Sequence, residues 1–167
     1  MITGGTIDKE YDPLTGELTF SKSHLINMLN QVRCKVRVVL EEVMLKDSLQ
    51  MMDEDREEIL NKCIQCQENR IIVTHGTDTM AETAQFLGHH VKDKTVVLVG
   101  AMIPYTFGAS DALFNLGCAF SAVQVLHPGV YITMNGKIFH WDNVRKNKES
   151  GEFEERQQEG ATSRDRK

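Results

Sequence analysis

The stretch "RIIVTHGTDTMAETAQFLGHH" (residues 70–90) has the pattern of a strand, a turn and a helix in direct succession. Its beginning is a short apolar run rich in Ile and Val, which is typical of a parallel strand covered on both faces. A glycine and a threonine follow at 76–77, and a helical pattern begins near residue 79. In open α/β sheets, ligands bind beyond the carboxyl ends of the strands, so we expect this turn at a binding edge.

The same alternation continues on both sides of this stretch. Strands are predicted at residues 36–45, 70–75, 95–102 and 130–134, and helices at residues 23–31, 53–67, 79–89 and 111–126. This repetition predicts a doubly wound α/β fold, in which helices flank a mostly parallel sheet. The 167 residues suggest one domain. We place that domain at residues 1–146 and a polar, mobile tail at residues 147–167, where charged residues dominate.

A second glycine–threonine turn, "TGGTID" (residues 3–8), stands at the start of the chain. Such a turn should follow a strand, yet only Met1 and Ile2 precede it, so the first strand is either missing or barely two residues long. Both turns offer backbone N–H groups and a hydroxyl, a combination that suits an oxyanion or a carboxylate. The alternative is that Thr6 and Thr77 only cap helices or turns.

Composition narrows the classes of ligand. The formal charge is −5, from 24 acidic and 19 basic residues, which disfavours a nucleic-acid surface and favours a small molecule. No apolar run approaches the roughly 20 residues that span a bilayer, and the N-terminus lacks a signal-peptide pattern. The four cysteines are scattered, so we interpret them as reduced thiols and expect no metal site and a cytoplasmic location.

The sequence resembles the bacterial-type L-asparaginases, which hydrolyse asparagine to aspartate and ammonia. The matching segments occur in family order and at nearly family spacing: "TGGTI" (3–7), "DSLQMMDED" (47–55), "THGTDTM" (74–80), "GAMIP" (100–104), "SDALFNL" (110–116) and "MNGKIFHWDNVRK" (134–146). They correspond only to the N-terminal catalytic domain of the family. The resemblance therefore implies a short, single-domain member that needs no cofactor and forms homo-oligomers.

The resemblance also implies chemical roles. Thr6 matches the first catalytic threonine, which attacks the side-chain amide and forms an acyl-enzyme. Thr77, Asp78 and Lys146 match the second catalytic group, in which a lysine beside a hydroxyl moves protons. Tyr11 is the candidate for a tyrosine that a mobile loop brings to the nucleophile. Which threonine attacks first stays open, and without the resemblance Lys146 would be read as a solvated lysine.

Substrate binding is implied for a further set of residues at these turns: Gly5, Ser48, Gly76, Thr77, Asp78 and Ala101. Ser48 matches a serine that binds the α-carboxylate, Asp78 matches the carboxylate that binds the α-ammonium, and Ala101 matches a backbone carbonyl near the departing amide. The chain departs from the family pattern at Leu49 and Arg145, where the family has polar and small polar residues. It also lacks the C-terminal domain from which a neighbouring protomer supplies an acidic residue. Two other functions therefore stay open, namely hydrolysis of another amide, such as glutamine or an amidotransferase substrate, and a catalytically silent amino-acid-binding domain.

Overall fold

The computed structural model describes residues 1–156. Its centre is a six-stranded sheet in the order β4-β1-β5-β6-β7-β8. The strands of this sheet are β1 (Ile2–Gly4), β4 (Glu42–Lys46), β5 (Arg70–Thr74), β6 (Thr95–Val99), β7 (Gly129–Met134) and β8 (Lys137–His140). All neighbouring pairs are parallel except β7 and β8, which are antiparallel. The prediction of a doubly wound, mostly parallel α/β sheet is confirmed.

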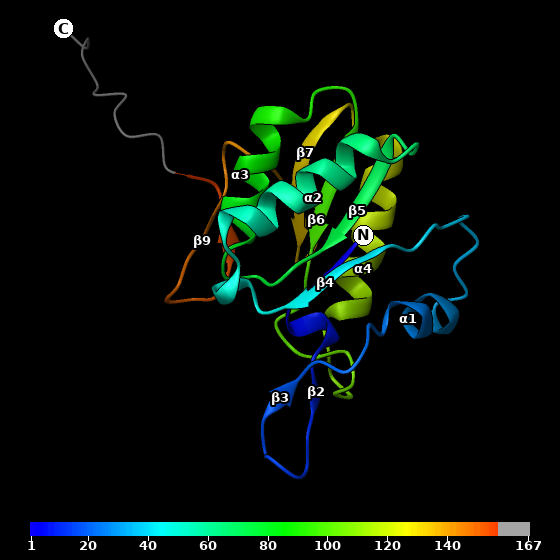
Figure 1. The fold of residues 1–167 in the computed structure, drawn as a ribbon, viewed down its shortest axis with the longest axis vertical. Helices are drawn as coiled ribbons and strands as arrows, with labels where there is room; N and C mark the ends of the chain where they lie inside the picture. Colours follow the sequence, from blue (N-terminus) through cyan, green and yellow to red (C-terminus); the bar gives the residue numbers. More distant parts are fainter. Residues whose placement is uncertain (157–167) are drawn as a thin grey trace, which may run out of the picture.

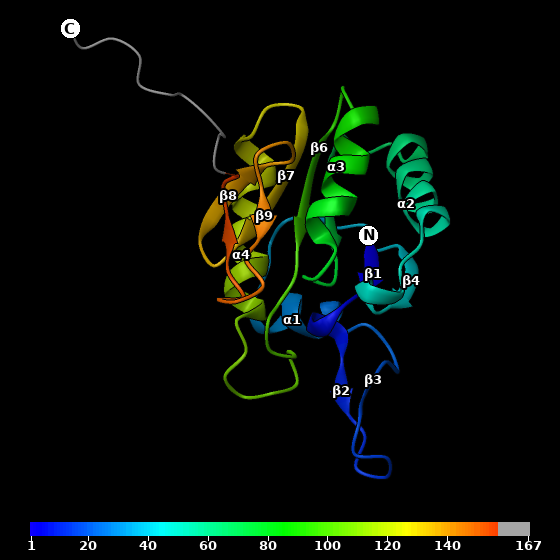
Figure 2. The same ribbon diagram turned by 90° about the vertical axis from the view of Figure 1, so that its left-hand side faces the viewer.

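Helices cover both faces of the sheet, which gives three layers (Figure 2). The four helices of residues 1–156 are α1 (Leu25–Gln31), α2 (Asp53–Gln65), α3 (Met80–His90) and α4 (Ala112–Val125). One core cluster contains buried side chains of α2 and α3, and the other contains those of α1 and α4. β6 lies between the two clusters, and all five of its residues are buried, as the continuous apolar run predicted. None of these helices is long and apolar enough to cross a membrane.

The first strand corrects the sequence-based expectation. β1 exists, comprises three residues and lies between the edge strand β4 and β5. The strand expected at residues 36–45 begins only at Glu42, because β1 offers no pairing partner to the preceding residues. The strand expected at 95–102 ends at Val99, where the chain turns.

The C-terminal part of the fold extends beyond the predicted boundary at residue 146. The short strands β9 (Arg145–Lys146) and β10 (Phe153–Glu154) form an antiparallel pair, and Phe153 is buried in the core. Residues 147–156 therefore belong to the folded body and not to a tail, because one aromatic side chain packs among the core residues. The rest of the predicted tail lies outside the described residues.

Three short elements complete the fold. A hairpin of β2 (Glu10–Tyr11) and β3 (Leu18–Thr19) extends away from the sheet (Figure 1). Two 3₁₀ turns, η1 (Thr6–Asp8) and η2 (Ser48–Gln50), follow the carboxyl ends of β1 and β4. These turns place the chain segments of the candidate site at one edge of the sheet.

Candidate active site

Turns that follow β1, β4 and β5 pack against one another at the carboxyl edge of the sheet. Gly5 has a φ of 84°, and a Cβ atom there would lie 2.3 Å from the backbone nitrogen of Gly76. A Cβ atom on Gly76 would lie 2.5 Å from Ser48 Oγ. Only glycine permits such approaches, so the two glycine–threonine turns and η2 form one contiguous surface.

The strongest polar cluster at this edge joins the turn after β5 to β9. Lys146 Nζ donates hydrogen bonds to Thr77 Oγ1 at 2.8 Å and to Asp78 Oδ1 at 2.7 Å. Thr77 is buried, the Lys146 side chain is 12% exposed, and the Asp78 side chain is 48% exposed. Lys146 is held in register by its pairing with Phe153 in β10. An ammonium that contacts a hydroxyl and a carboxylate can move a proton to or from that hydroxyl while its charge stays balanced.

Ser48 has a free hydroxyl beside this cluster. Its Oγ is buried and makes no hydrogen bond with any described residue, although buried polar atoms are usually paired. The turn that holds it is well fixed, because Asp47 accepts a hydrogen bond from Leu49 N and Ser48 O accepts one from Thr79 Oγ1. An unpaired hydroxyl on a rigid turn is available as a donor to a ligand oxygen.

His75, for which the sequence analysis gave no role, supports this turn through hydrogen bonds of its buried ring. The His75 ring is buried, with Nδ1 2.7 Å from Gly76 O and Nε2 2.9 Å from Thr83 Oγ1. A neutral ring that donates from Nδ1 and accepts at Nε2 satisfies both contacts. Burial lowers the pKa of His75 to about 4, so the ring stays neutral at physiological pH. The sequence shows a histidine at a strand end, but the partner threonine in α3 becomes visible only in the folded chain.

Asp111 and Asn115 organise the turn after β6. The Asp111 carboxylate accepts hydrogen bonds from Met102 N and Ile103 N, and Asn115 Nδ2 donates to Gly100 O and to Asp111 Oδ2. Asp111 is the N-cap residue of α4, but its side chain makes no capping hydrogen bond and holds the preceding turn instead. Ala101 lies in this turn and is fully buried.

Thr6 and Tyr11 are less closely integrated. Thr6 begins η1 and is half-buried, and its neighbour Asp8 accepts hydrogen bonds from Ser23 Oγ and His24 N. Tyr11 lies in the β2–β3 hairpin and is 56% exposed. Among the described residues, no hydrogen bond joins the Tyr11 hydroxyl to Thr6. The structure therefore brings Ser48, Thr77, Asp78 and Lys146 together with the Gly5–Thr6 turn, and leaves Tyr11 outside that group.

Comparisons with known proteins agree on one family. The family model described as "Asparaginase, N-terminal" matches residues 1–157. "L-asparaginase 2" of Escherichia coli (strain K12) is 35% identical over 159 residues, which cover 87% of this chain and 45% of the relative. One subunit of the glutamyl-tRNA(Gln) amidotransferase of Methanococcus vannielii is 33% identical over 147 residues, which cover 81% of this chain and 33% of the relative. The solved structure "The thermostable L-asparaginase from Thermococcus kodakarensis" has a TM-score of 0.80 at 28% identity and covers 92% of this chain and 49% of that one. The chain thus spans less than half the length of each of these relatives.

Proposed function

Because this chain belongs to the asparaginase family, we propose that it is an amidohydrolase that converts L-asparagine to L-aspartate and ammonia. The observation that supports this proposal most strongly is the contact of Lys146 Nζ with both Thr77 Oγ1 and Asp78 Oδ1. A helix cap or a solvated lysine would not bring an ammonium onto a buried threonine. Such an arrangement is suited to proton transfer at a reacting amide.

In the proposed reaction, Thr6 Oγ1 attacks the carbon of the side-chain amide. The C–N bond breaks, ammonia leaves, and an ester joins the acyl group to Thr6. Water then cleaves this ester, which releases aspartate and restores the threonine hydroxyl. Thr77 and Lys146 take up and return the protons of both steps, and N–H groups of the glycine turns face the oxyanion.

Recognition of a free amino acid requires one anion and several donors. Asp78 is half exposed, so its carboxylate can bind the α-ammonium, while the unpaired Ser48 Oγ can donate to the α-carboxylate. Asp78→Asn keeps the shape of the side chain and removes its charge. We expect aspartate to bind about 10- to 150-fold more weakly to this variant, the equivalent of one hydrogen bond to a charged group.

A second candidate is ammonia release from another amide. The similarity to the amidotransferase of Methanococcus vannielii supports this alternative, because the match covers 81% of this chain. The Lys146 cluster would serve both reactions equally. Only the substrate distinguishes them.

The test is an assay of ammonia release by the full 167-residue chain, with asparagine, glutamine and other amides as substrates. We expect release from asparagine that falls by at least about 100-fold in both Thr6→Ala and Thr77→Ala. Ser121→Ala, an exposed hydroxyl on α4 far along the chain from the turns, is the control and should keep full activity. An acid quench should trap the acyl group on Thr6, whereas a label on Thr77 would exchange the roles of the two threonines. Release from a different amide alone would favour the second candidate, and binding of aspartate without release from any amide would indicate a silent binding domain.

Because Asp78 is open to solvent in the single chain, we also propose that self-association completes the site. Sedimentation of the purified chain tests this proposal. A monomer with full activity would contradict it.

A further inference from the structure

An ion pair links the two turns that carry Thr6 and Ser48. Lys9, the residue that follows η1, donates a hydrogen bond from Nζ to Asp47 Oδ2, and the two atoms are 2.5 Å apart. The Lys9 side chain is 18% exposed and that of Asp47 is 28% exposed, so the pair is largely shielded from solvent. It joins residues that are 38 positions apart in the sequence. Neither residue has a part in the proposed reaction.

The Asp47 carboxylate is charged and fixed in place. Its Oδ1 accepts a hydrogen bond from Leu49 N at 2.9 Å, which caps η2. Burial acts to raise the pKa of Asp47, but the hydrogen bonds from Lys9 and from Leu49 N outweigh burial and hold this pKa below its ordinary value. At neutral pH the Lys9 ammonium therefore faces an ionised carboxylate, and each charge neutralises the other.

A backbone contact joins the same two turns on the other side of Thr6. Gly5 N donates a hydrogen bond to Lys46 O at 3.1 Å. Lys46 is directly followed by Asp47, so Gly5 and Lys9, which flank Thr6, are bound to adjacent residues of one other segment. The Thr6 turn is thus held between two fixed points. It cannot change its separation from η2 unless one of these contacts breaks.

The position of Lys9 is fixed by further neighbours. Its ammonium lies 5.6 Å from the centre of the Phe20 ring, within the range of cation–π attraction. Its carbonyl accepts a hydrogen bond from Thr106 Oγ1 at 3.3 Å. The preceding residue, Asp8, accepts a hydrogen bond from His24 N at 2.8 Å. Contacts with η2, the hairpin, the turn after β6 and the start of α1 therefore suit Lys9 to hold a position and not to follow a ligand.

The two turns would contact opposite ends of one substrate. In the proposed reaction, Thr6 attacks the side-chain amide, while the unpaired Ser48 Oγ donates to the α-carboxylate. The length of the chain between the amide and the α-carbon therefore decides whether both contacts form at once. Glutamine is one methylene longer than asparagine, so turns at a fixed separation fit only one of the two. A difference of one methylene is worth about 10- to 200-fold in discrimination.

We propose that the Lys9–Asp47 pair determines substrate length, because it holds the Thr6 turn at a fixed separation from Ser48 and thereby selects asparagine over glutamine. This inference rests on the proposed function, in which Thr6 and Ser48 contact one substrate. Lys9 and Asp47 are positioning residues, since neither has to touch the substrate. Without the pair, the segment after Thr6 can move away from η2, and the longer amide can then form both contacts.

The experiment measures kcat/KM for ammonia release from asparagine and from glutamine by the full 167-residue chain. Lys9→Met removes one charge and keeps much of the side-chain length. Asp47→Asn removes the other charge and keeps the oxygen that accepts from Leu49 N. We expect the ratio of asparagine to glutamine to fall at least about tenfold in each variant. The double variant should show the same ratio as either single variant, because both substitutions remove one interaction.

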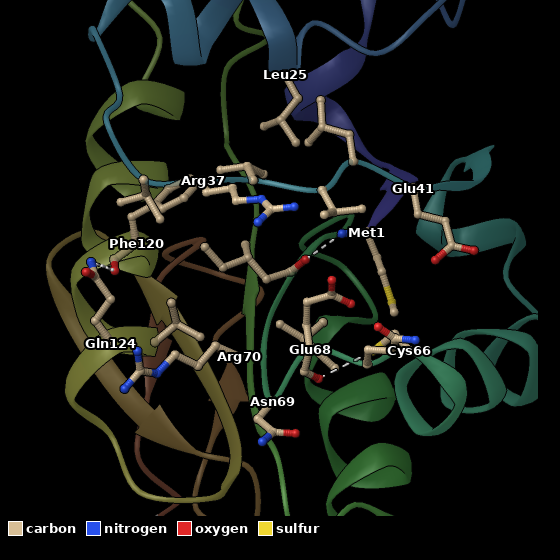
Figure 3. A pocket seen from close by; sticks show the side chains of 18 of the residues that line it. Met1, Leu25, Arg37, Glu41, Cys66, Glu68, Asn69, Arg70, Phe120 and Gln124 are labelled. Carbon is tan, nitrogen blue, oxygen red and sulfur yellow. Dashed lines mark hydrogen bonds between the residues drawn. The ribbon is translucent and has the colours of Figure 1, made fainter.

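This ratio separates positioning from a loss of folded protein. Partial unfolding lowers kcat/KM for both amides by the same factor and leaves their ratio unchanged. Lys9→Arg keeps a cation that can reach Asp47 and should retain the wild-type ratio. Lys62→Met breaks a pair of the same kind, with 2.6 Å between Lys62 Nζ and Glu41 Oε1, and should also retain that ratio. Glu41 lies at the amino end of β1, on the wall of a cavity of about 810 Å³ and away from the two turns (Figure 3).

Binding of the product acids gives a measurement that needs no catalysis. Calorimetry should show that the wild type binds L-aspartate more tightly than L-glutamate, and this preference should fall at least about tenfold in Lys9→Met. If no amide releases ammonia but this preference falls, the proposed function is wrong and the length selection is supported.

Other outcomes would overturn the length selection. If asparagine is hydrolysed and neither ratio changes in Lys9→Met and Asp47→Asn, the pair does not select length, although the proposed function stands. A wild type that does not distinguish the two lengths in either measurement would overturn the length selection as well.

Discussion

The two ends of β1 differ sharply in how they are packed. At the carboxyl end, Gly5 lies so close to Gly76 that no Cβ atom fits between the turns. At the amino end, the same strand borders a cavity of about 810 Å³. A strand of three residues thus connects closely packed turns at one end to a cavity at the other.

This difference shows what the sheet requires at each end. The carboxyl end must hold several hydroxyls and charges within hydrogen-bond distance, so small shifts of the turns are costly. At the amino end, Met1 forms the last described contacts of the β1 ladder with β5, through Ile72 O and Thr74 N. Changes at the carboxyl end should therefore affect ammonia release and the free energy of unfolding, whereas the amino end should differ in amide hydrogen exchange.

Removal of the Lys146 ammonium, at the carboxyl end of β1, should have the largest effect, which is on ammonia release. Lys146→Met removes the ammonium that contacts Thr77 and Asp78 but keeps much of the side-chain length. We expect ammonia release from asparagine to fall about 10²–10⁴-fold, the contribution of a general acid–base group. Arg145→Met, the neighbouring residue with an exposed side chain paired to Glu154, is the control and should lower the rate less than threefold or so. Equal losses in both variants would show that β9 matters only for folding.

A glycine substitution separates close packing from backbone strain. Gly5→Ala combines a φ of 84° with a Cβ atom 2.3 Å from Gly76 N, whereas Gly16→Ala has a φ of 76° and no neighbour within 4 Å. We expect Gly5→Ala to lower the free energy of unfolding by about 2–5 kcal/mol and Gly16→Ala by only about 1–2 kcal/mol. Urea denaturation measures both values. If the two losses are equal, the turns are not closely packed in solution.

Buried His75, which follows β5 at the carboxyl edge of the sheet, makes the free energy of unfolding depend on pH. The pKa of His75 is about 4 in the folded protein and about 6.5 in an unfolded chain. As the pH falls from about 6.5 to 4, the unfolded state takes up a proton that the native ring resists. This uptake lowers the free energy of unfolding by up to about 3 kcal/mol.

Comparison of variants isolates this contribution from that of the carboxylates. His75→Gln can donate to Gly76 O and accept from Thr83 without titrating, so its unfolding free energy should change less over this range than that of the wild type. His127→Gln removes an exposed histidine and should keep the wild-type slope. Parallel curves for all three proteins would exclude His75 as the cause.

The smallest expected effect is a difference in amide hydrogen exchange at the amino end of β1, and it is measured on the wild-type protein. Ile72 N–H faces the cavity at the amino end of β1, whereas Val73 N–H faces β6, with which β5 is paired along its whole length. We expect the Ile72 amide to exchange with solvent hydrogen at least about tenfold faster than the Val73 amide, because only the latter has a partner strand. Native-state hydrogen exchange resolved by NMR measures both rates. Equal protection of the two amides would mean that the Ile72 N–H is shielded from solvent as well as the Val73 N–H is.

Local patterns in the sequence were sufficient for most of the architecture. The strands at β5, β6 and β7 and the four helices follow from apolar runs and helical periodicity, since each is decided by neighbours within a few residues. The motifs around Thr6, Ser48, Thr77 and Lys146 likewise indicated the family, which the comparisons confirm. The roles of these residues stay predictions until activity is measured.

Other features depend on contacts between distant parts of the chain and became visible only in the folded structure. The insertion of β1 between β4 and β5 brings Gly5 onto Gly76, and the return of β10 buries Phe153 and holds Lys146 beside Thr77, 69 residues away. The contact between His75 and Thr83 likewise became visible only in the folded structure. Periodicity reports which face of an element is apolar, but it does not report which strands become neighbours. Pairing of distant strands decides both the closely packed turns at one end of β1 and the cavity at the other, because each is made by residues from several strands at once.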